Sequence, residues 1–173
     1  MDMNISRFTR HILAAAFVCA VALPAPSHAV IQKGQPAPPL KVVSTSGQPI
    51  TLSNYKGYVL VIDFFATWCP PCREAVPHLV GLNRKYGKQG LQILGLSLDE
   101  GDEGGVKDFI SSKRINYPVA LAGQDVQSDY GLRSLPTVYV IDKRGVVAEK
   151  FQGGSEETLR RMEELVKKLL AEK

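Results

Sequence analysis

The sequence has few cysteines, and their placement limits what they can do for stability. Three cysteines occur in 173 residues: Cys19 lies near the N-terminus, and Cys69 and Cys72 are separated by two residues. A disulfide stabilises a fold mainly by closing a long loop of the unfolded chain, and a bond between these two neighbours closes almost none. Small secreted scaffolds depend on several such bonds. The cysteine count therefore argues against a disulfide scaffold.

Charge of one sign and long apolar runs are also scarce. The formal net charge is +4, from 21 lysines and arginines against 17 acidic residues, and the charges are scattered rather than gathered in a basic block. This pattern argues against a nucleic-acid partner. The apolar run over residues 12–23 has 12 residues, whereas a helix needs roughly 20 to cross a bilayer. No internal repeat is present, and the length suits one domain.

The N-terminus has the pattern of a secretory signal peptide. Arg7 and Arg10 precede the apolar run over residues 12–23, and small residues lead to Ala29. A basic start, a short apolar stretch and small residues before a cleavage point define such segments. We therefore expect residues 1–29 to direct export, to the periplasm or the outer face of the cytoplasmic membrane. An uncleaved membrane anchor is the alternative.

Residues 30–173 are expected to form a single α/β domain. Two short strands around a Ser-Gly turn, within LKVVSTSGQPITL, predict an N-terminal β-hairpin. The other segments expected as strands are VLVIDFFA (59–66), LQILGLSL (91–98), YPVAL, and a hairpin of 136–142 and 145–153. The segments expected as helices are 72–89, 106–115, 125–132 and the stretch from Ser155 onward. Strand–helix–strand units followed by a hairpin predict a central mixed β-sheet flanked by helices on both faces.

The motif Cys69-Pro70-Pro71-Cys72 joins the end of a predicted buried strand to the start of a helix. Cys69 is therefore expected at the helix N-terminus, where free amide donors and the helix dipole favour a thiolate. Cys72 falls one turn into the helix and is expected to be shielded. The pair is thus predicted to combine an exposed nucleophile with a buried resolving thiol, an arrangement suited to thiol–disulfide exchange.

Asp63 lies six residues before Cys69, inside the apolar run of the preceding strand. A carboxylate buried there loses its hydration, so its pKa is expected to be raised. A carboxyl group with a raised pKa beside a buried thiol is suited to accept the proton of Cys72. The alternative is that Asp63 points to solvent at a strand edge.

Two cysteines three positions apart are also a metal-binding pattern. A structural zinc site needs four ligands, and the chain after residue 29 offers only Cys69, Cys72 and one histidine, His78. Thiol pairs also bind Cu(I), so copper handling stays an alternative. We expect no metal and no cofactor, and we interpret His78 as a helix-surface residue.

The segment FFATWCPPCREAVPHL closely resembles the thioredoxin-like, exported thiol–disulfide oxidoreductases of the ResA/TlpA type. The segment LRSLPTVYVIDKRGVV resembles the part of these proteins that carries a cis-proline and the last hairpin. The resemblance covers about residues 33–170. It implies a thioredoxin fold of the redoxin or AhpC/TSA type, with an N-terminal β-hairpin extension.

The resemblance also implies roles for individual residues. Cys69 is the attacking thiol and Cys72 the resolving thiol, and together they form the redox-active disulfide. Trp68 flanks the site. Pro136 is the expected cis-proline, packed against the thiol pair, and Leu135 offers its backbone to the partner. A cis bond occurs before only about 5% of prolines in folded proteins, so this is a specific prediction.

Two positions depart from or vary the ResA/TlpA pattern. These proteins commonly carry a glutamate three residues after the second cysteine, where this chain has Ala75, and Glu74 falls on a different helix face. Asp63 matches the buried aspartate of ordinary thioredoxins, where many ResA/TlpA-type members have asparagine. We infer that Asp63 handles the proton in this chain.

The resemblance implies an enzyme that reduces protein disulfides in an oxidising compartment, recharged by a membrane electron donor. The expected substrate is a disulfide-bearing protein, such as an apocytochrome c or a factor of cytochrome c maturation, and we expect the enzyme to be a monomer. A disulfide oxidase or isomerase would use the same thiols and stays an alternative. A peroxidase is disfavoured, because peroxidases usually have threonine three residues before the reactive cysteine, and Thr67 is two before Cys69.

Overall fold

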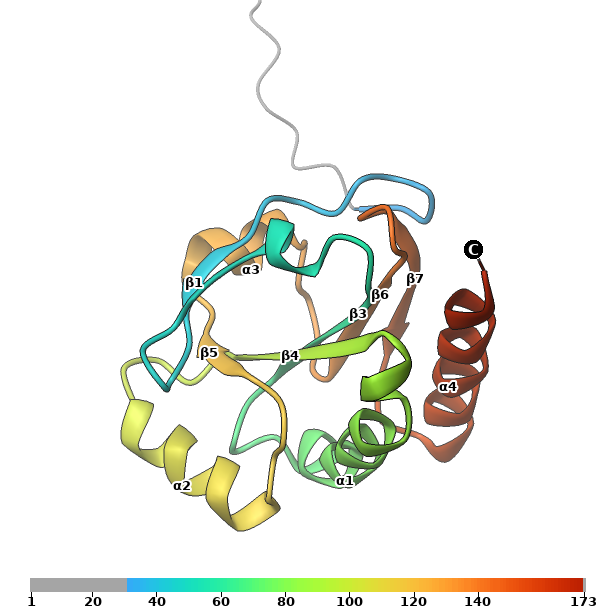
Figure 1. The fold of residues 1–173 in the computed structure, drawn as a ribbon. Helices are drawn as coiled ribbons and strands as arrows, with labels where there is room; N and C mark the ends of the chain where they lie inside the picture. The colour runs from blue at the N-terminus through green and yellow to red at the C-terminus, as the bar shows by residue number, and fades with distance from the viewer. Residues whose placement is uncertain (1–30, 173) are drawn as a thin grey trace, which may run out of the picture.

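The computed structural model describes residues 31–172. The signal peptide expected over residues 1–29 lies outside this range and stays a prediction. A five-stranded sheet in the order β5-β4-β3-β6-β7 forms the centre of the fold (Figure 1). Its strands are β3 (Val59–Phe65), β4 (Leu91–Ser97), β5 (Val119–Leu121), β6 (Thr137–Ile141) and β7 (Val147–Gln152). β4 is parallel to β3 and β5, whereas β6 is antiparallel to β3 and β7, so the sheet is mixed as predicted.

The N-terminal extension is the predicted hairpin. β1 (Lys41–Val43) and β2 (Pro49–Thr51) pair antiparallel as a separate two-stranded sheet. Gly47 has a φ of 82° in the turn between them, a conformation that glycine adopts without steric penalty. Ile50 of β2 is buried in the core of the main sheet, so the hairpin is part of the domain.

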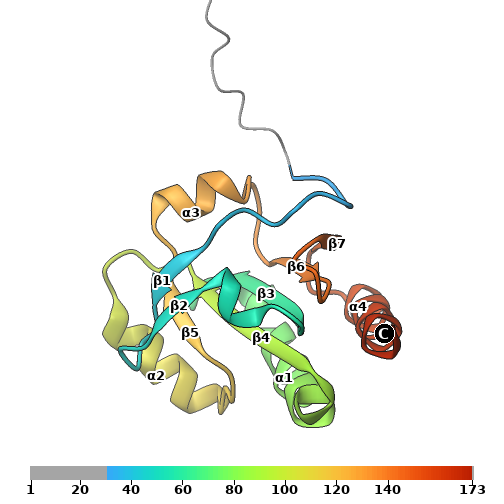
Figure 2. The ribbon, with the colours of Figure 1, turned by 45° about the horizontal axis from the view of Figure 1, so that its top comes forward.

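Helices cover both faces of the main sheet, as predicted, but unequally (Figure 2). One face carries α1 (Pro70–Tyr86), α2 (Glu103–Lys113) and α4 (Glu156–Ala171). The other face carries the short helix α3 (Gln124–Asp129) together with the N-terminal hairpin. Within residues 31–172, no helix combines the length and apolar character that a bilayer span requires.

β3 is buried on both faces, which explains its nearly continuous apolar sequence. Side chains alternate between the two faces along a strand. Val61 and Phe65 accordingly belong to the core under α1, α2 and α4. Ile62 and Phe64 belong to the core under α3 and the hairpin. Asp63 lies between Val61 and Phe65 in this alternation, so it faces the core under α1.

α2 begins earlier than the sequence predicts, at Glu103 rather than at Val106. The prediction starts late because Gly104 and Gly105 precede Val106, and glycine is a weak helix former. The Asp102 carboxylate accepts a hydrogen bond from the backbone N–H of Gly105 at 2.8 Å and caps the helix. This cap, together with the burial of Val106 and Phe109, outweighs the low helix propensity of the glycines.

Candidate active site

The two cysteines are joined by a disulfide at the start of α1. Cys69 is the N-cap residue, and its Sγ accepts a hydrogen bond from the backbone N–H of Cys72 at 3.3 Å. Pro70 and Pro71 occupy the first helical positions, where the amide group that proline lacks has no partner within the helix. The positive end of the helix dipole therefore lies beside Cys69 and stabilises a thiolate formed there on reduction.

Cys69 and Cys72 differ in access, though less than the sequence predicts. In the disulfide form Cys69 is 4% exposed and Cys72 is 1% exposed, so the prediction of an exposed Cys69 is wrong for this form. The bond draws the Cys69 sulfur against the first turn of α1. Cys69 nevertheless lines an open groove and Cys72 does not. The groove is lined by residues of the segment that carries the first cysteine and by residues more distant in sequence: Trp68, Cys69, Pro70, Pro71, Leu98, Gln127, Leu132, Arg133, Ser134 and Leu135.

The residues predicted to bind a partner lie at or next to this groove. Trp68 is 69% exposed, although tryptophan is a highly buried residue type on average. Leu135 also lines the groove, and the Leu135–Pro136 peptide bond is cis, as predicted. Pro136 is buried and is not among the groove residues. An exposed tryptophan next to a disulfide is a suitable anchor for a protein partner.

Asp63 is buried in the centre of the sheet. Its side chain is 2% exposed, and its Oδ1 atom has no hydrogen-bond partner among residues 31–172. Burial raises the pKa of Asp63 from 3.8 to about 7, because the charged form loses its hydration. The alternative of a solvent-facing position at a strand edge is therefore wrong. Asp63 faces the core that contains both cysteines.

The sequence analysis does not predict a buried polar cluster that lies beside the disulfide. Asp99 accepts hydrogen bonds from the backbone N–H of Thr67 at 2.9 Å and from its hydroxyl at 2.6 Å. The hydroxyl of Ser97 donates to the same carboxylate, and Arg73 donates to the Thr67 carbonyl at 3.0 Å. These bonds hold the loop that leads into Cys69. The sequence signal that could have identified Asp99 is its position just after the end of β4, the strand parallel to β3.

The glutamate that is common in ResA/TlpA-type proteins has no counterpart at the same position of α1. Ala75 is buried there, and Glu74 is exposed on another face of α1. His78 is half-buried rather than on the open helix surface, and it lines a pocket against Arg160 and Glu163 of α4. In the described part of the chain, no three His, Cys, Asp or Glu side chains are grouped so as to hold a metal ion.

Comparison with known protein families gives a consistent result. The model of the AhpC/TSA family matches residues 33–150. The thiol-disulfide oxidoreductase ResA of Bacillus anthracis is 36% identical over 140 residues, which are 80% of this chain and 79% of that protein. The thioredoxin-like protein YneN of Bacillus subtilis (strain 168) is 31% identical over 120 residues, which are 69% of this chain and 71% of that protein.

Solved structures show the same similarity. The crystal structure of a putative thiol:disulfide interchange protein DsbE from Chlorobium tepidum superposes with a TM-score of 0.76 at 29% identity. The match covers 82% of this chain and 99% of that chain. The residues matched by the family model, 33–150, include the disulfide, Asp63 and the cis-proline.

Proposed function

This chain belongs to the AhpC/TSA family and is a thiol–disulfide oxidoreductase, and we propose that it reduces protein disulfides outside the cytoplasm. The observation that carries the proposal is the Cys69–Cys72 disulfide at the start of α1, with Cys69 lining an open groove. This bond closes only a short loop, so its placement serves exchange with a partner better than it serves stability.

The exchange has two steps. The Cys69 thiolate attacks one sulfur of the partner's disulfide, a mixed disulfide forms, and the partner's other sulfur leaves as a thiolate. The Cys72 thiolate then attacks the Cys69 sulfur, and the partner's second sulfur leaves. The partner has gained two electrons and the Cys69–Cys72 disulfide has formed. A dithiol electron donor must therefore reduce the enzyme before the next cycle.

Asp63 is proposed to accept the proton of Cys72. The second step requires the Cys72 thiolate, and the thiol lies in a core where water is scarce. Asp63 faces that core, and its pKa of about 7 leaves it partly ionised at neutral pH and able to take a proton. The alanine at position 75, where ResA/TlpA-type proteins commonly carry a glutamate, supports this assignment.

Location and partners are proposed from the family resemblance. Residues 1–29 would direct export to the periplasm or the outer face of the cytoplasmic membrane, where a reductant needs a membrane electron donor. Trp68 and the backbone of Leu135 would hold the partner, and the cis bond at Pro136 would orient that backbone. The partner would be a disulfide-bearing protein, such as an apocytochrome c or a factor of its maturation. The enzyme would work as a monomer without a metal or cofactor.

Disulfide donation or isomerisation is the competing function, because it would use the same two thiols. Peroxide reduction has less support, since the Thr67 hydroxyl donates to Asp99 and stands two residues before Cys69.

The reduction potential of the Cys69–Cys72 couple tests the direction of electron flow. The protein is equilibrated with a thiol buffer of known potential, and its free thiols are then alkylated and counted. A reductant should have a value near or below roughly −270 mV, as thioredoxin has. A value near roughly −120 mV, as strong oxidants have, would overturn the reductant proposal in favour of disulfide donation.

A further inference from the structure

Within residues 31–172, three buried side-chain atoms have no hydrogen-bond partner. One is Nε2 of His78 on α1, which lines the pocket against α4. The other two are Oδ1 of Asp63, in the middle of β3, and the hydroxyl of Tyr117, two residues before β5. Buried polar atoms without a partner are uncommon, because each has given up its hydrogen bonds to water. A pair of them on one side of a sheet, close to a reactive disulfide, needs an explanation.

Gly95 of β4 allows these two groups to approach each other. Asp63 pairs with Gly95 in the parallel register of β3 and β4, so the two positions face the same side of the sheet. A Cβ atom at Gly95 would lie 3.4 Å from Cε2 of Tyr117, the ring carbon next to the one that carries the hydroxyl. The edge of the Tyr117 ring therefore lies over Gly95, beside the strand position of Asp63.

The elements around Asp63 leave few groups that could pair with its charge. The apolar side chains that they place on this side include Val106 and Phe109 of α2 and Val138 of β6. The buried titratable groups of this core are the two cysteines, Tyr86 and Tyr117, and Tyr86 donates its hydroxyl to Glu163. Arg73 of α1 lies over the Phe109 ring and donates to the Thr67 carbonyl, and His78 of α1 lines the pocket against α4. The cysteines are the reacting groups, so Tyr117 is the remaining donor.

We propose that the Tyr117 hydroxyl is the positioning partner of Asp63, donating a hydrogen bond to the ionised carboxylate and holding it ready to take the proton of Cys72. Tyr117 keeps its own proton throughout. The only proton that moves passes from the Cys72 thiol to Asp63. The role of this pair in proton transfer from Cys72 rests on the proposed function and deepens it. The hydrogen bond between Tyr117 and Asp63 does not depend on the proposed function.

The electrostatics of the pair support this role. Burial, and in addition the charge of Asp63, raise the pKa of Tyr117 well above its ordinary value, so the hydroxyl remains a donor at neutral pH. A hydrogen bond to the carboxylate stabilises the charged form of Asp63. Removal of the hydroxyl should therefore raise the pKa of Asp63 further.

Tyr117→Phe tests the pairing, because it removes the hydroxyl and keeps the ring. NMR titration of the Asp63 carboxyl carbon, in the oxidised full-length protein labelled with ¹³C-aspartate, measures the pKa without turnover. We expect the pKa of Asp63 to rise by about one pH unit. Tyr86→Phe is the matched control, since it removes a hydroxyl of the same core that donates to Glu163 instead. This control should leave the pKa of Asp63 unchanged.

Two further measurements complete the test. The first uses the wild-type protein. The NMR chemical shifts of the Tyr117 ring should change with pH at the same midpoint as the Asp63 carboxyl. With a small thiol preloaded on Cys69, the attack of Cys72 should slow about five-fold at pH 7 in Tyr117→Phe and recover at pH 9.

The outcomes separate the pairing from the proposed function. An unchanged Asp63 pKa in Tyr117→Phe, or a Tyr117 ring that does not respond when Asp63 titrates, overturns the pairing. A raised Asp63 pKa with an unchanged resolving rate upholds the pairing and overturns the proton role that the proposed function gives to Asp63.

Discussion

Asp63 occupies a strand position where an aliphatic side chain would be more stable at neutral pH. It is buried between Val61 and Phe65 on the face under α1. Burial of an ionised carboxylate costs more hydration free energy than a single hydrogen bond returns, and this raises the free energy of the folded state. The raised pKa of Asp63 is the measure of this penalty. At the residue scale, the property that suits Asp63 to proton transfer is thus also a source of instability.

Asp63→Asn should stabilise the oxidised protein above neutral pH. The protonated carboxyl contributes stability that is complete below pH 3.8 and is lost as the pH rises through about 7. Asparagine stays neutral, so at pH 8 the variant should be more stable than the wild type by up to about 4 kcal/mol. The difference should shrink toward pH 5. Urea unfolding of both proteins from pH 5 to pH 8 measures it.

The same variant should slow the attack of Cys72 on a mixed disulfide at pH 7, because the proton acceptor is gone. Asp108→Asn, exposed on α2, is the matched control and should change stability by less than about 0.5 kcal/mol at any pH. A stability difference that does not vary with pH, or an unchanged resolving rate, would count against the assignment of Asp63.

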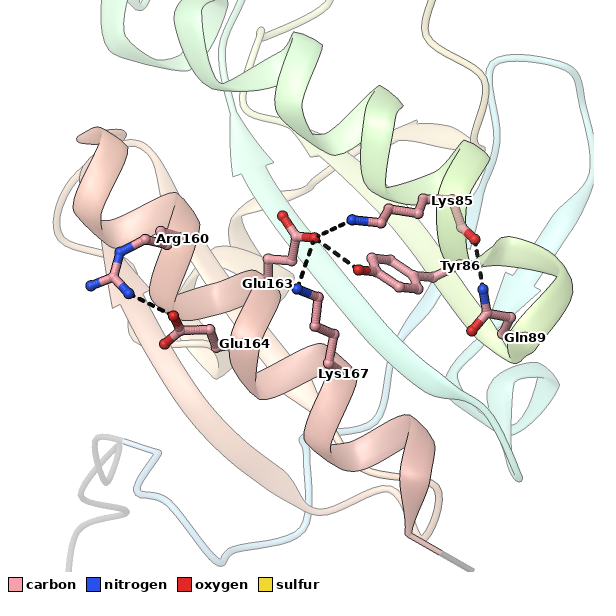
Figure 3. A network of polar contacts seen from close by, with 7 residues as sticks. All are labelled: Lys85, Tyr86, Gln89, Arg160, Glu163, Glu164 and Lys167. Carbon is pink, nitrogen blue, oxygen red and sulfur yellow. Dashed lines mark hydrogen bonds and ion pairs between the residues drawn. The ribbon is translucent and has the colours of Figure 1, made fainter.

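At the scale of elements, Glu163 attaches α4 to α1 (Figure 3). Its Oε1 accepts hydrogen bonds from Nζ of Lys85 at 2.9 Å and from the hydroxyl of Tyr86 at 2.8 Å, and Nζ of Lys167 lies 3.5 Å away. The bonds from Lys85 and Tyr86 lower the pKa of Glu163 to about 2. The helix that begins at Cys69 is thereby held to the C-terminal helix.

Glu163→Gln should weaken this attachment and lower the free energy of unfolding at pH 7 by about 1 kcal/mol, because a neutral amide replaces the carboxylate that accepts from Lys85 and Tyr86. The contribution of ionised Glu163 is complete above pH 4.5 and is lost as the pH falls toward about 2. The gap between wild type and variant should therefore narrow from pH 5 to pH 3 in denaturant unfolding.

Glu164→Gln is the control for this prediction. Among residues 31–172, Glu164 pairs only with Arg160, on the exposed side of α4, and such pairs contribute less than about 0.5 kcal/mol. Equal losses in the two variants would show that Glu163 does not join the helices.

At the scale of the whole molecule, the two cores share β3. On the face away from the disulfide, the ring of Phe64 lies 5.1 Å from that of Tyr130 and 6.1 Å from that of Tyr139. Tyr139 donates its hydroxyl to the Tyr130 carbonyl at 2.6 Å, and Tyr130 donates to the Pro38 carbonyl at 3.0 Å. This cluster joins the end of α3, β6 and the N-terminal segment, so both faces are expected to unfold together.

Phe64→Ala should lower the free energy of unfolding by about 3 to 5 kcal/mol, the range for removing a buried aromatic ring. Because β3 belongs to both cores, the most protected amides of α1, on the opposite face, should be affected too. Their free energy of hydrogen exchange should fall by the same amount as the free energy of unfolding. Val43→Ala, on the exposed side of β1, is the control. Wild-type protection of α1 in Phe64→Ala would show that the faces unfold separately.

The elements that sequence patterns predict well are those with a strong local signal. β3 and the hairpin of β6 and β7 appear where apolar runs and turn residues place them, and the cis bond before Pro136 agrees with the family resemblance. The start of α2 is wrong by three residues, because the cap from Asp102 outweighs glycine propensity. The exposure of Cys69 is overstated, because access depends on the disulfide and on loops distant in sequence.

Local patterns are therefore sufficient to predict β3, the start of α1 and the pair of cysteines there, since each depends on residues a few positions apart. They also place Asp63 in an apolar run and so anticipate its raised pKa. The hydrogen bonds of Asp99 to Thr67 depend on the register of β3 and β4. The position of the Tyr117 ring over Gly95 depends on this register and on the loop before β5. Such contacts join residues 20 or more positions apart. Tertiary packing sets them, because a side chain's partner across a sheet is fixed by strand order and register rather than by its neighbours in the chain.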